Sequence, residues 1–353
     1  MQQISASGQF YLEAGKPFER RDFTLVIDQA DQLIVEVAGC GLCHTDISFY
    51  SGQVATKQPL PIVLGHEISG KVVAAGEQYA KLIGKSVVVP AVLPCGECSL
   101  CQSGRDNICQ QQLMPGNDFN GGFATHLKLP GRHICVLPEE LGNLELSQLS
   151  VVADAITTPY QSILRSGLQK GEVAIVIGVG GVGIYMVQHA RNVGAHVIAL
   201  DIDQGKLDHA KTMGAEATLM VKGLSDRDVK KAVRALVKEH SYPSVGHKVF
   251  EVSGTAAGQN VAFSLLTFAG TLGVVGFTME KSNLRLSNIM AFDADVFGNW
   301  GCRPAYYDNV VESAIAGEID IKSNVEPFPL DSINQVVGMA MEHKLEKRAI
   351  FIP

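Results

Sequence analysis

The chain has 353 residues, of which 46% are hydrophobic and 18% charged, and its formal net charge at pH 7 is −7. This length predicts about two domains with ordinary cores, and this composition excludes an intrinsically disordered chain. The acidic balance argues against a protein that binds nucleic acid or anionic membranes, although a local basic pocket for a phosphorylated ligand stays compatible with it.

The start of the chain and its apolar runs indicate where the protein works. The first 25 residues are rich in charge and lack an apolar core, so we expect no secretory signal. Uncharged apolar runs stay below the roughly 18 residues that a membrane span needs. Eight cysteines without a signal peptide predict metal ligands or free thiols in a reducing cytoplasm rather than disulfides.

Residues 1–150 have the pattern of a β-rich domain. Short apolar runs at 33–37, 68–73 and 87–90 alternate with glycine and proline breaks. This pattern predicts short strands of a barrel-like or rolled sheet rather than repeating βαβ units.

Residues 39–67 are the first candidate for chemistry. They place the thiol of Cys43 beside the hydroxyl of Thr45 and the carboxylate of Asp46, and they end in the pair His66 and Glu67. Sulfur with imidazole is a typical ligand set for zinc, but a third ligand must come from elsewhere in the chain.

A four-cysteine segment at about 94–110 carries the strongest local signal. Cys95, Cys98 and Cys101 are each separated by two residues, and Cys109 follows after seven more. Four thiolates so close can surround one zinc ion at about 2.3 Å, with no open position for a substrate. Disulfides, unrelated free thiols and an iron–sulfur cluster are the alternatives, although the spacing is not that of the common ferredoxins. We therefore expect a structural zinc lobe.

From about residue 150 the pattern changes to that of an α/β domain. A helical segment at 146–166 contains Asp154, Thr157 and Thr158. Apolar strands and amphipathic helices then alternate, with strands at 174–177, 196–200, 217–221, 249–252 and 272–275 and helices at 181–192, 204–213, 226–239 and 256–268. This alternation predicts a parallel, doubly wound Rossmann sheet with helices on both faces.

The first strand of this half leads into a glycine-rich turn. Gly178, Gly180 and Gly183 match G-x-G-x-x-G between a strand and a helix, and Asp201 follows eighteen residues after Gly183 at the end of the next strand. Such a turn lets a pyrophosphate approach the helix N-terminus. Asp201 would bind ribose hydroxyls and repel a 2′-phosphate, so we expect NAD rather than NADP. A glycine-rich turn without a ligand is the alternative.

With these motifs the chain resembles the zinc-dependent medium-chain alcohol dehydrogenases over its whole length. The resemblance rests on GLCHTD, GHE, the four cysteines, the region of Asp154, and GVGGVG with Asp201. It implies a GroES-like catalytic domain at 1–150, a Rossmann domain at 151–300, and a return of the chain to the catalytic domain at 301–353. It also implies an active site between the two domains and a homo-oligomer, either a dimer or a tetramer.

The resemblance also implies roles for single residues. Cys43, His66 and Asp154 match the ligands of the catalytic zinc, and Glu67 matches a fourth residue that can coordinate it. Thr45 would take the proton of the substrate alcohol, and Asp46 would orient the histidine ligand. The residues expected to contact the cofactor are Gly178, Gly180, Gly181, Val182, Gly183, Asp201, Lys206 and, as a pyrophosphate ligand, Arg348.

Two positions depart from the family pattern. Ser48 stands where many relatives have a histidine that passes the proton to solvent, so the relay must end differently here. The usual Gly-Asp-Arg-Val appears as Gly84, Lys85, Ser86 and Val87, which removes a common charge pair near the metal.

The segments LMPGNDFNGGFATHLKLPGR and FGNWGCRPAYYDNV resemble a narrower group, the NAD-dependent 6-hydroxycyclohex-1-ene-1-carbonyl-CoA dehydrogenases of anaerobic aromatic degradation. This implies a CoA thioester substrate, whose phosphates need cationic partners. Arg132, Arg165 and Arg303 are candidates, although solvated surface positions are the simpler interpretation. The alternatives are a dehydrogenase of polyols or small secondary alcohols, a non-catalytic NAD-binding protein, and a zinc-ribbon nucleic-acid binder, which the acidic charge disfavours.

Overall fold

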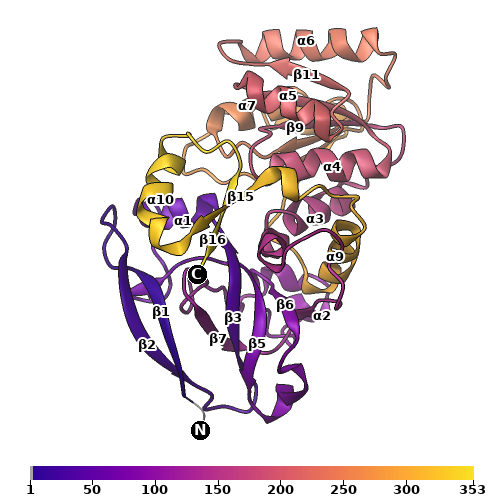
Figure 1. Cartoon of the computed structure of the whole chain (residues 1–353). Coiled ribbons are helices and arrows are strands. Elements are labelled where there is room, and N and C mark those ends of the chain that lie inside the picture. Colours follow the sequence, from indigo (N-terminus) through magenta and orange to yellow (C-terminus); the bar gives the residue numbers. More distant parts are fainter. Residues whose placement is uncertain (1–2) are drawn as a thin grey trace. The chain divides into compact units, whose positions relative to one another are not determined.

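The computed structural model describes residues 3–353, and in it the chain divides into two units (Figure 1). The first unit holds the chain up to Thr157 together with Gly301–Pro353, and the second holds Thr158–Trp300. Among the described residues, no helix is long and apolar enough to cross a bilayer.

The first unit is built on two sheets. A three-stranded antiparallel sheet has the order β2-β1-β4, and a seven-stranded sheet has the order β15-β16-β3-β5-β6-β8 with β7 paired to β3. The strands are β1 (Gln3–Tyr11), β2 (Glu19–Val26), β3 (Gln32–Gly41), β4 (Ile62–Val63), β5 (Glu67–Ala75), β6 (Ser86–Val89), β7 (His126–Pro130), β8 (Cys135–Val136), β15 (Val325–Pro329) and β16 (Arg348–Ile352). Because β16 pairs with the end of β3, the last residues of the chain lie beside the first predicted metal ligand.

Short helices cover and connect these strands. The α-helices are α1 (His44–Tyr50), α2 (Ser99–Gln102), α9 (Tyr307–Ile315) and α10 (Ile333–Met341), and the 3₁₀ turns are η1 (Glu77–Leu82), η2 (Asp106–Ile108), η3 (Leu146–Ala153), η4 (Pro304–Tyr306), η5 (Lys322–Asn324) and η6 (Leu330–Ser332). The hydrophobic core between the strands includes Leu33, Ile68, Phe123 and Phe351, each with 0% exposure. Burial of these apolar side chains supplies the main free energy that stabilises the unit and so fixes the loops that carry the site.

The second unit is a six-stranded parallel sheet with the order β11-β10-β9-β12-β13-β14. Its strands are β9 (Val173–Ile177), β10 (His196–Asp201), β11 (Ala217–Met220), β12 (Lys248–Glu251), β13 (Thr271–Val274) and β14 (Asp295–Gly298), and its helices are α3 (Thr157–Ser166), α4 (Gly183–Val193), α5 (Gln204–Met213), α6 (Asp226–Glu239), α7 (Ala256–Ser264) and α8 (Ser287–Phe292). All five residues of β9 are buried, as expected for a central parallel strand. The predicted fold class, a Rossmann sheet joined to a GroES-like domain, is confirmed.

The helix predicted at 146–166 is wrong as one continuous element. The structure has a 3₁₀ helix at Leu146–Ala153 and an α-helix at Thr157–Ser166, with a break at Asp154. Asp154 has φ −145° and ψ −56°, which no helix accommodates. The apolar pattern runs across the break because both pieces bury one face, so periodicity alone could not reveal it.

Candidate active site

The loop after β3 and the start of β5 place Cys43 and His66 together. Cys43 is the N-cap of α1, and the carboxylate of Asp46 accepts hydrogen bonds from Cys43 N at 2.9 Å and from Gly65 N at 3.1 Å. The same carboxylate faces Nδ1 of His66 at 3.4 Å. Asp46 is buried, at 2% exposure. Its carboxylate therefore fixes the backbone at Cys43 and at Gly65, the neighbour of His66, and orients the imidazole of His66.

His66 is a buried imidazole whose nitrogens make no hydrogen bond with the described residues. The ring is 1% exposed, and its Nε2 lies 3.6 Å from Oδ2 of Asp154. Burial disfavours the imidazolium, but the negative charges of Asp46 and Cys43 outweigh it and raise the pKa of His66 well above its usual value. Surroundings that attract a proton so strongly also attract a metal cation.

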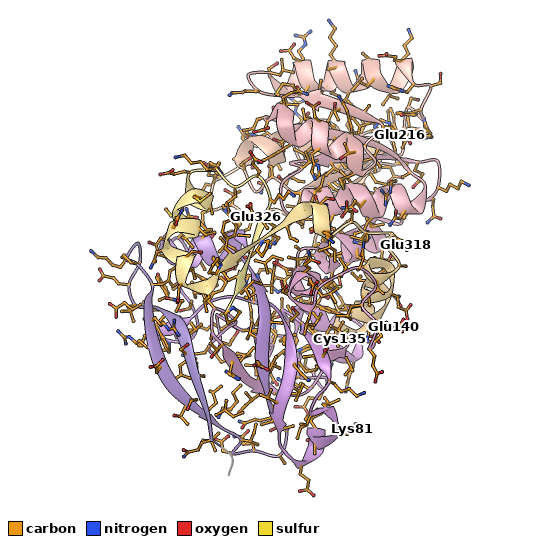
Figure 2. All side chains as sticks on the ribbon, in the orientation of Figure 1. Lys81, Cys135, Glu140, Glu216, Glu318 and Glu326 are labelled. Carbon is orange, nitrogen blue, oxygen red and sulfur yellow. The ribbon has the colours of Figure 1, made fainter. Side chains whose placement is uncertain are left out.

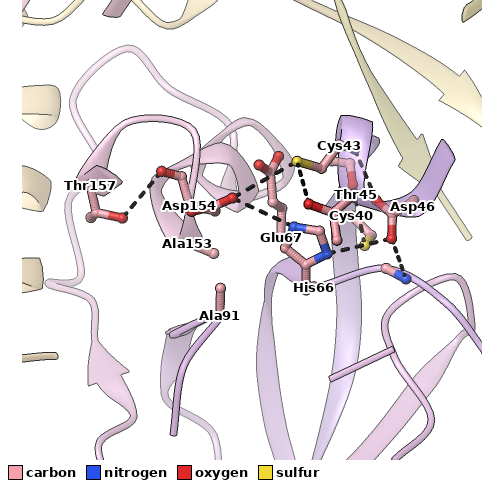
Figure 3. A network of polar contacts seen from close by, with 12 residues as sticks. Cys40, Cys43, Thr45, Asp46, His66, Glu67, Ala91, Ala153, Asp154 and Thr157 are labelled. Carbon is pink, nitrogen blue, oxygen red and sulfur yellow. Dashed lines mark hydrogen bonds and ion pairs between the residues drawn. The ribbon is translucent and has the colours of Figure 1, made fainter. Parts of the chain in front are cut away.

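Asp154 completes the donor set. Cys43, His66, Glu67 and Asp154 each offer one ligand atom, and all four atoms lie within 4.8 Å of one another (Figure 3). Sγ of Cys43 lies 3.9 Å from Oδ2 of Asp154. One sulfur, one imidazole and a carboxylate are the donors that zinc prefers, and Nε2 of His66, which is buried and makes no hydrogen bond with the described residues, can bind the ion while Asp46 faces Nδ1. The residues present therefore fit a zinc ion.

The hydroxyls of Thr45 and Ser48 on α1 differ in what they contact. Oγ1 of Thr45 lies 3.8 Å from Sγ of Cys43, at the edge of the donor set (Figure 3). Ser48 is buried and donates its hydroxyl hydrogen to the carbonyl of His44 at 3.1 Å. The hydroxyl of Ser48 is thus hydrogen-bonded within its own helix and does not extend a chain of hydroxyls from Thr45.

Glu67 and Arg348 form a buried ion pair that joins β5 to β16. Nε of Arg348 lies 2.8 Å from one carboxylate oxygen of Glu67, and a second guanidinium nitrogen bonds the other oxygen. Glu67 is 0% and Arg348 9% exposed. Burial raises the pKa of Glu67, and the guanidinium of Arg348 opposes that rise. The structure thus gives Arg348 a carboxylate partner, while its contact with a pyrophosphate stays a prediction.

The four-cysteine segment forms one cluster. The sulfurs of Cys98 and Cys101 are 3.5 Å apart and those of Cys95 and Cys109 also 3.5 Å. These distances exceed the 2.05 Å of a disulfide, so the disulfide alternative is wrong here. Hydrogen bonds from the backbone N–H groups of Glu97 and Cys98 lower the pKa of Cys95 to about 6, which favours the thiolate that zinc binds.

The glycine turn of the second unit leaves room where the cofactor is predicted. Gly178 has φ +85°, and a side chain on Gly183 would come within 1.8 Å of the carbonyl of Gly178. A side chain on Gly180 would meet nothing within 4 Å. Only glycine allows both the turn and this close helix packing, so the turn opens onto free space at the start of α4.

Asp201 is held beside this turn at the end of β10. Its carboxylate accepts hydrogen bonds from Val179 N at 2.8 Å and Ile202 N at 2.7 Å, and it is 8% exposed. The backbone N–H of Lys206 donates a hydrogen bond to the side chain of Asp203, which caps the start of α5. The roles of Gly181, Val182 and Lys206 toward a cofactor stay predictions.

Two of the three arginines considered for CoA phosphates, Arg165 and Arg303, have partners within the protein, whereas Nε of Arg132 is buried and makes no hydrogen bond with the described residues. Arg303 pairs with Asp106 at 2.6 Å, and 27% of its side chain stays exposed. Arg165 donates to the carbonyl of Gly298 at 2.5 Å and lies over the ring of Phe297. Neither pairing could be found from the sequence, because the partners are separated by more than one hundred residues.

Comparisons with known proteins match both halves of the chain. The family described as alcohol dehydrogenase GroES-like domain matches residues 29–139, and the family described as zinc-binding dehydrogenase matches residues 181–316. An alcohol dehydrogenase of Geobacillus stearothermophilus is 27% identical over 90% of this chain and 91% of its own. A D-arabitol-phosphate dehydrogenase of Enterococcus avium is 27% identical over 88% of this chain and 87% of its own. The crystal structure of an alcohol dehydrogenase from Aeropyrum pernix covers 98% of this chain and 100% of its own, with 26% identity and a TM-score of 0.87.

The class of the protein follows from these matches and from the donor sets: it is an enzyme, an oxidoreductase of the dehydrogenase type. Within that class, the chain belongs to the zinc-dependent medium-chain alcohol dehydrogenase family. The predicted family and enzyme class are confirmed. The narrower resemblance to a CoA dehydrogenase finds no support among these relatives and stays a prediction.

Proposed function

We propose that this enzyme oxidises a secondary alcohol to a ketone with NAD as the hydride acceptor. The observation that carries the proposal is the convergence of Cys43, His66 and Asp154, with the hydroxyl of Thr45 beside them. A histidine–thiolate–carboxylate set with three ligands leaves a position where a substrate hydroxyl can sit, unlike the closed four-cysteine cluster.

The residues have distinct parts in this reaction. Zinc, when bound, supplies a Lewis acid that lowers the pKa of the substrate hydroxyl, and NAD supplies the hydride acceptor. Cys43, His66 and Asp154 would hold the ion, and Asp46 keeps the imidazole in its orientation. Thr45 accepts the proton of the substrate hydroxyl. Because Ser48 is bonded within its helix, the proton leaves Thr45 by a route other than Ser48.

NAD is favoured over NADP because Asp201 places a carboxylate beside the glycine turn. We expect Asp201→Ala to lower kcat/KM for NAD by about tenfold to a hundredfold, the value of a hydrogen bond to a charged group, and to improve the use of NADP relative to NAD. Initial rates with both cofactors check this. Asp203→Ala is the matched control, since that exposed carboxylate caps α5 and should leave the NAD-to-NADP ratio unchanged. An unchanged ratio in Asp201→Ala would contradict this prediction.

Two substrate classes are candidates for this site. The resemblance of two segments favours an alicyclic hydroxyacyl-CoA, 6-hydroxycyclohex-1-ene-1-carbonyl-CoA. The D-arabitol-phosphate dehydrogenase among the relatives favours a polyol or another small secondary alcohol. The pairing of Arg303 with Asp106 weakens the case for Arg303 as a CoA phosphate partner, because its charge is already balanced within the protein.

One experiment tests metal, cofactor and substrate class together. NADH formation is followed with the full-length enzyme against secondary alcohols, polyols and hydroxyacyl-CoAs, with and without a zinc chelator. Chelator-sensitive NADH formation supports the proposal, and the better substrate class decides between the two. If all three classes yield no NADH from zinc-loaded enzyme, the proposal is wrong.

We also infer a cytoplasmic homo-oligomer, in which the exposed end of the second unit is an interface between copies. Strand β14 ends the parallel sheet, and apolar side chains nearby are open to solvent: Val296 (42%), Trp300 (51%) and Met290 (77%). An apolar sheet edge of this kind favours pairing with another chain. Light scattering should give at least twice the mass of one chain, and Val296→Lys should lower it. A monomeric wild-type protein would contradict this inference.

A further inference from the structure

The backbone around Asp154 has little regular structure to hold it. Asp154 follows the 3₁₀ helix η3 and precedes α3, at the break already described. Its carboxylate must nonetheless stay within reach of Cys43 and His66, which lie on β-strand loops far away in the sequence. A ligand on an irregular loop needs support from neighbouring groups if the donor set is to keep its geometry.

Tyr307 provides such support from the returning segment of the chain. It is the first residue of α9, 1% exposed, and its hydroxyl donates to the carbonyl of Ala153, the residue before Asp154. The same hydroxyl accepts a hydrogen bond from Ala91 N at 3.3 Å. Ala91 N also approaches the carbonyl of Ala153, at the longer distance of 3.4 Å. The hydroxyl of Tyr307 thus joins Ala91, in the segment after β6, to the loop that carries Asp154.

The position of Tyr307 is itself fixed on both sides. Arg303 pairs with Asp106 in the four-cysteine lobe and lies over the ring of Tyr306. On the other side, the thiol of Cys135, labelled in Figure 2, donates to the carboxylate of Asp308 at 3.4 Å. Tyr307 is therefore held in register by contacts with the lobe and with β8, and it can transmit that order to Asp154.

We propose that Tyr307 is a positioning residue for Asp154, the third ligand of the active-site metal, and that the segment at 301–307 anchors this ligand to the four-cysteine lobe. The inference rests on the proposed metal site. This role differs from simple packing of the Tyr307 ring in the core. It depends on the hydroxyl group, and it affects the site of Cys43, His66 and Asp154 but not the four-cysteine cluster.

The test is Tyr307→Phe in the full-length enzyme, which removes the hydroxyl and keeps the ring. We expect zinc to bind about tenfold more weakly at the Cys43, His66 and Asp154 set and with unchanged affinity at the four-cysteine cluster. Equilibrium competition with a chromophoric chelator measures both affinities. Cobalt substituted for zinc adds a spectroscopic readout, since its visible absorption reports the ligand geometry of each site.

Tyr11→Phe is the matched control. Tyr11 is also buried, at 5% exposure, and its hydroxyl donates to a backbone carbonyl, that of Phe49, at 2.8 Å. Each variant loses a buried hydrogen bond to a backbone carbonyl, and Tyr307→Phe also loses the longer one from Ala91 N, so a general loss of stability should appear in both. Only Tyr307→Phe should change the zinc affinity and the cobalt spectrum of the active-site set.

The outcomes separate this inference from the proposed function. If wild-type enzyme binds two zinc ions and Tyr307→Phe binds both as tightly as Tyr11→Phe does, Tyr307 is not a positioning residue. If wild-type enzyme binds zinc only at the four cysteines, the proposed metal site itself is wrong. Should Tyr307→Phe fail to fold, Arg303→Gln replaces it, because it loosens the same segment, and unchanged zinc affinity there overturns the proposal.

Discussion

Cys43→Ala will leave the enzyme with one zinc ion per chain instead of two and will lower kcat/KM for alcohol oxidation by about a thousandfold. Zinc acting as a Lewis acid contributes several kcal/mol to catalysis, and each 1.36 kcal/mol is a factor of ten in rate. Elemental analysis of the purified variant and the initial rate of NADH formation measure the two effects.

The geometry explains why one sulfur should matter so much. Sγ of Cys43 lies within hydrogen-bonding range of both Asp154 and Thr45, so it touches the predicted third ligand and the predicted proton acceptor. Without it, His66 and two carboxylates remain, and this harder donor set binds zinc less selectively. Loss of the sulfur therefore weakens the binding of zinc. It also removes a contact of Thr45, the predicted proton acceptor.

Cys40→Ala is the matched control for this prediction. Cys40 is a fully buried thiol on β3, three residues before Cys43, and it lies outside the donor set. We expect this variant to keep both zinc ions and wild-type kcat/KM, with some loss of stability from the cavity. If Cys43→Ala kept two zinc ions and full NAD reduction, the assignment of Cys43 as a metal ligand would be wrong.

Elements set by local sequence periodicity could be predicted well. The helices at 204–213 and 226–239 have the bounds of α5 and α6, because each begins at a capping side chain, Asp203 or Ser225, and carries its apolar residues on one face. The edge strand β14 was missed, because its exposed residues do not form an apolar run. Local pattern thus identified β11, the partly buried strand at the other edge of this sheet, but missed β14, which is mostly exposed.

The site shows a different limit. Residue chemistry pointed to Cys43 and His66, but the spacing of the chain gave no reason to select Asp154, which came from the family resemblance alone. The helix expected through Asp154 was wrong for a related reason, since the break serves contacts with distant residues. The pair of Glu67 with Arg348 had no sequence signal, because these residues are 281 positions apart. Tyr307 had none either, because its partner Ala153 is 154 positions away.

Arg348→Met should destabilise the enzyme by about 3–5 kcal/mol, because it leaves the buried carboxylate of Glu67 without its partner. Chemical unfolding of the full-length enzyme without NAD measures this, so that any loss of cofactor binding does not contribute. Arg20→Met is the matched control: Arg20 pairs with Asp331 at 3.0 Å, but both side chains are more than half exposed. Such a surface pair is worth less than about 1 kcal/mol.

The pH dependence distinguishes an unpaired buried charge from a simple loss of packing. Burial already raises the pKa of Glu67, and removing Arg348 deletes the main influence that lowers it. An acid whose pKa is higher in the folded state binds more protons there, so its folding stability falls as pH rises above the unfolded pKa of about 4.3. The deficit of Arg348→Met should therefore be smallest near pH 4–5 and grow toward pH 8. Glu67→Gln combined with Arg348→Met should remove the pH dependence. A deficit of Arg348→Met that is independent of pH would mean that lost packing, and not the charge of Glu67, destabilises the variant.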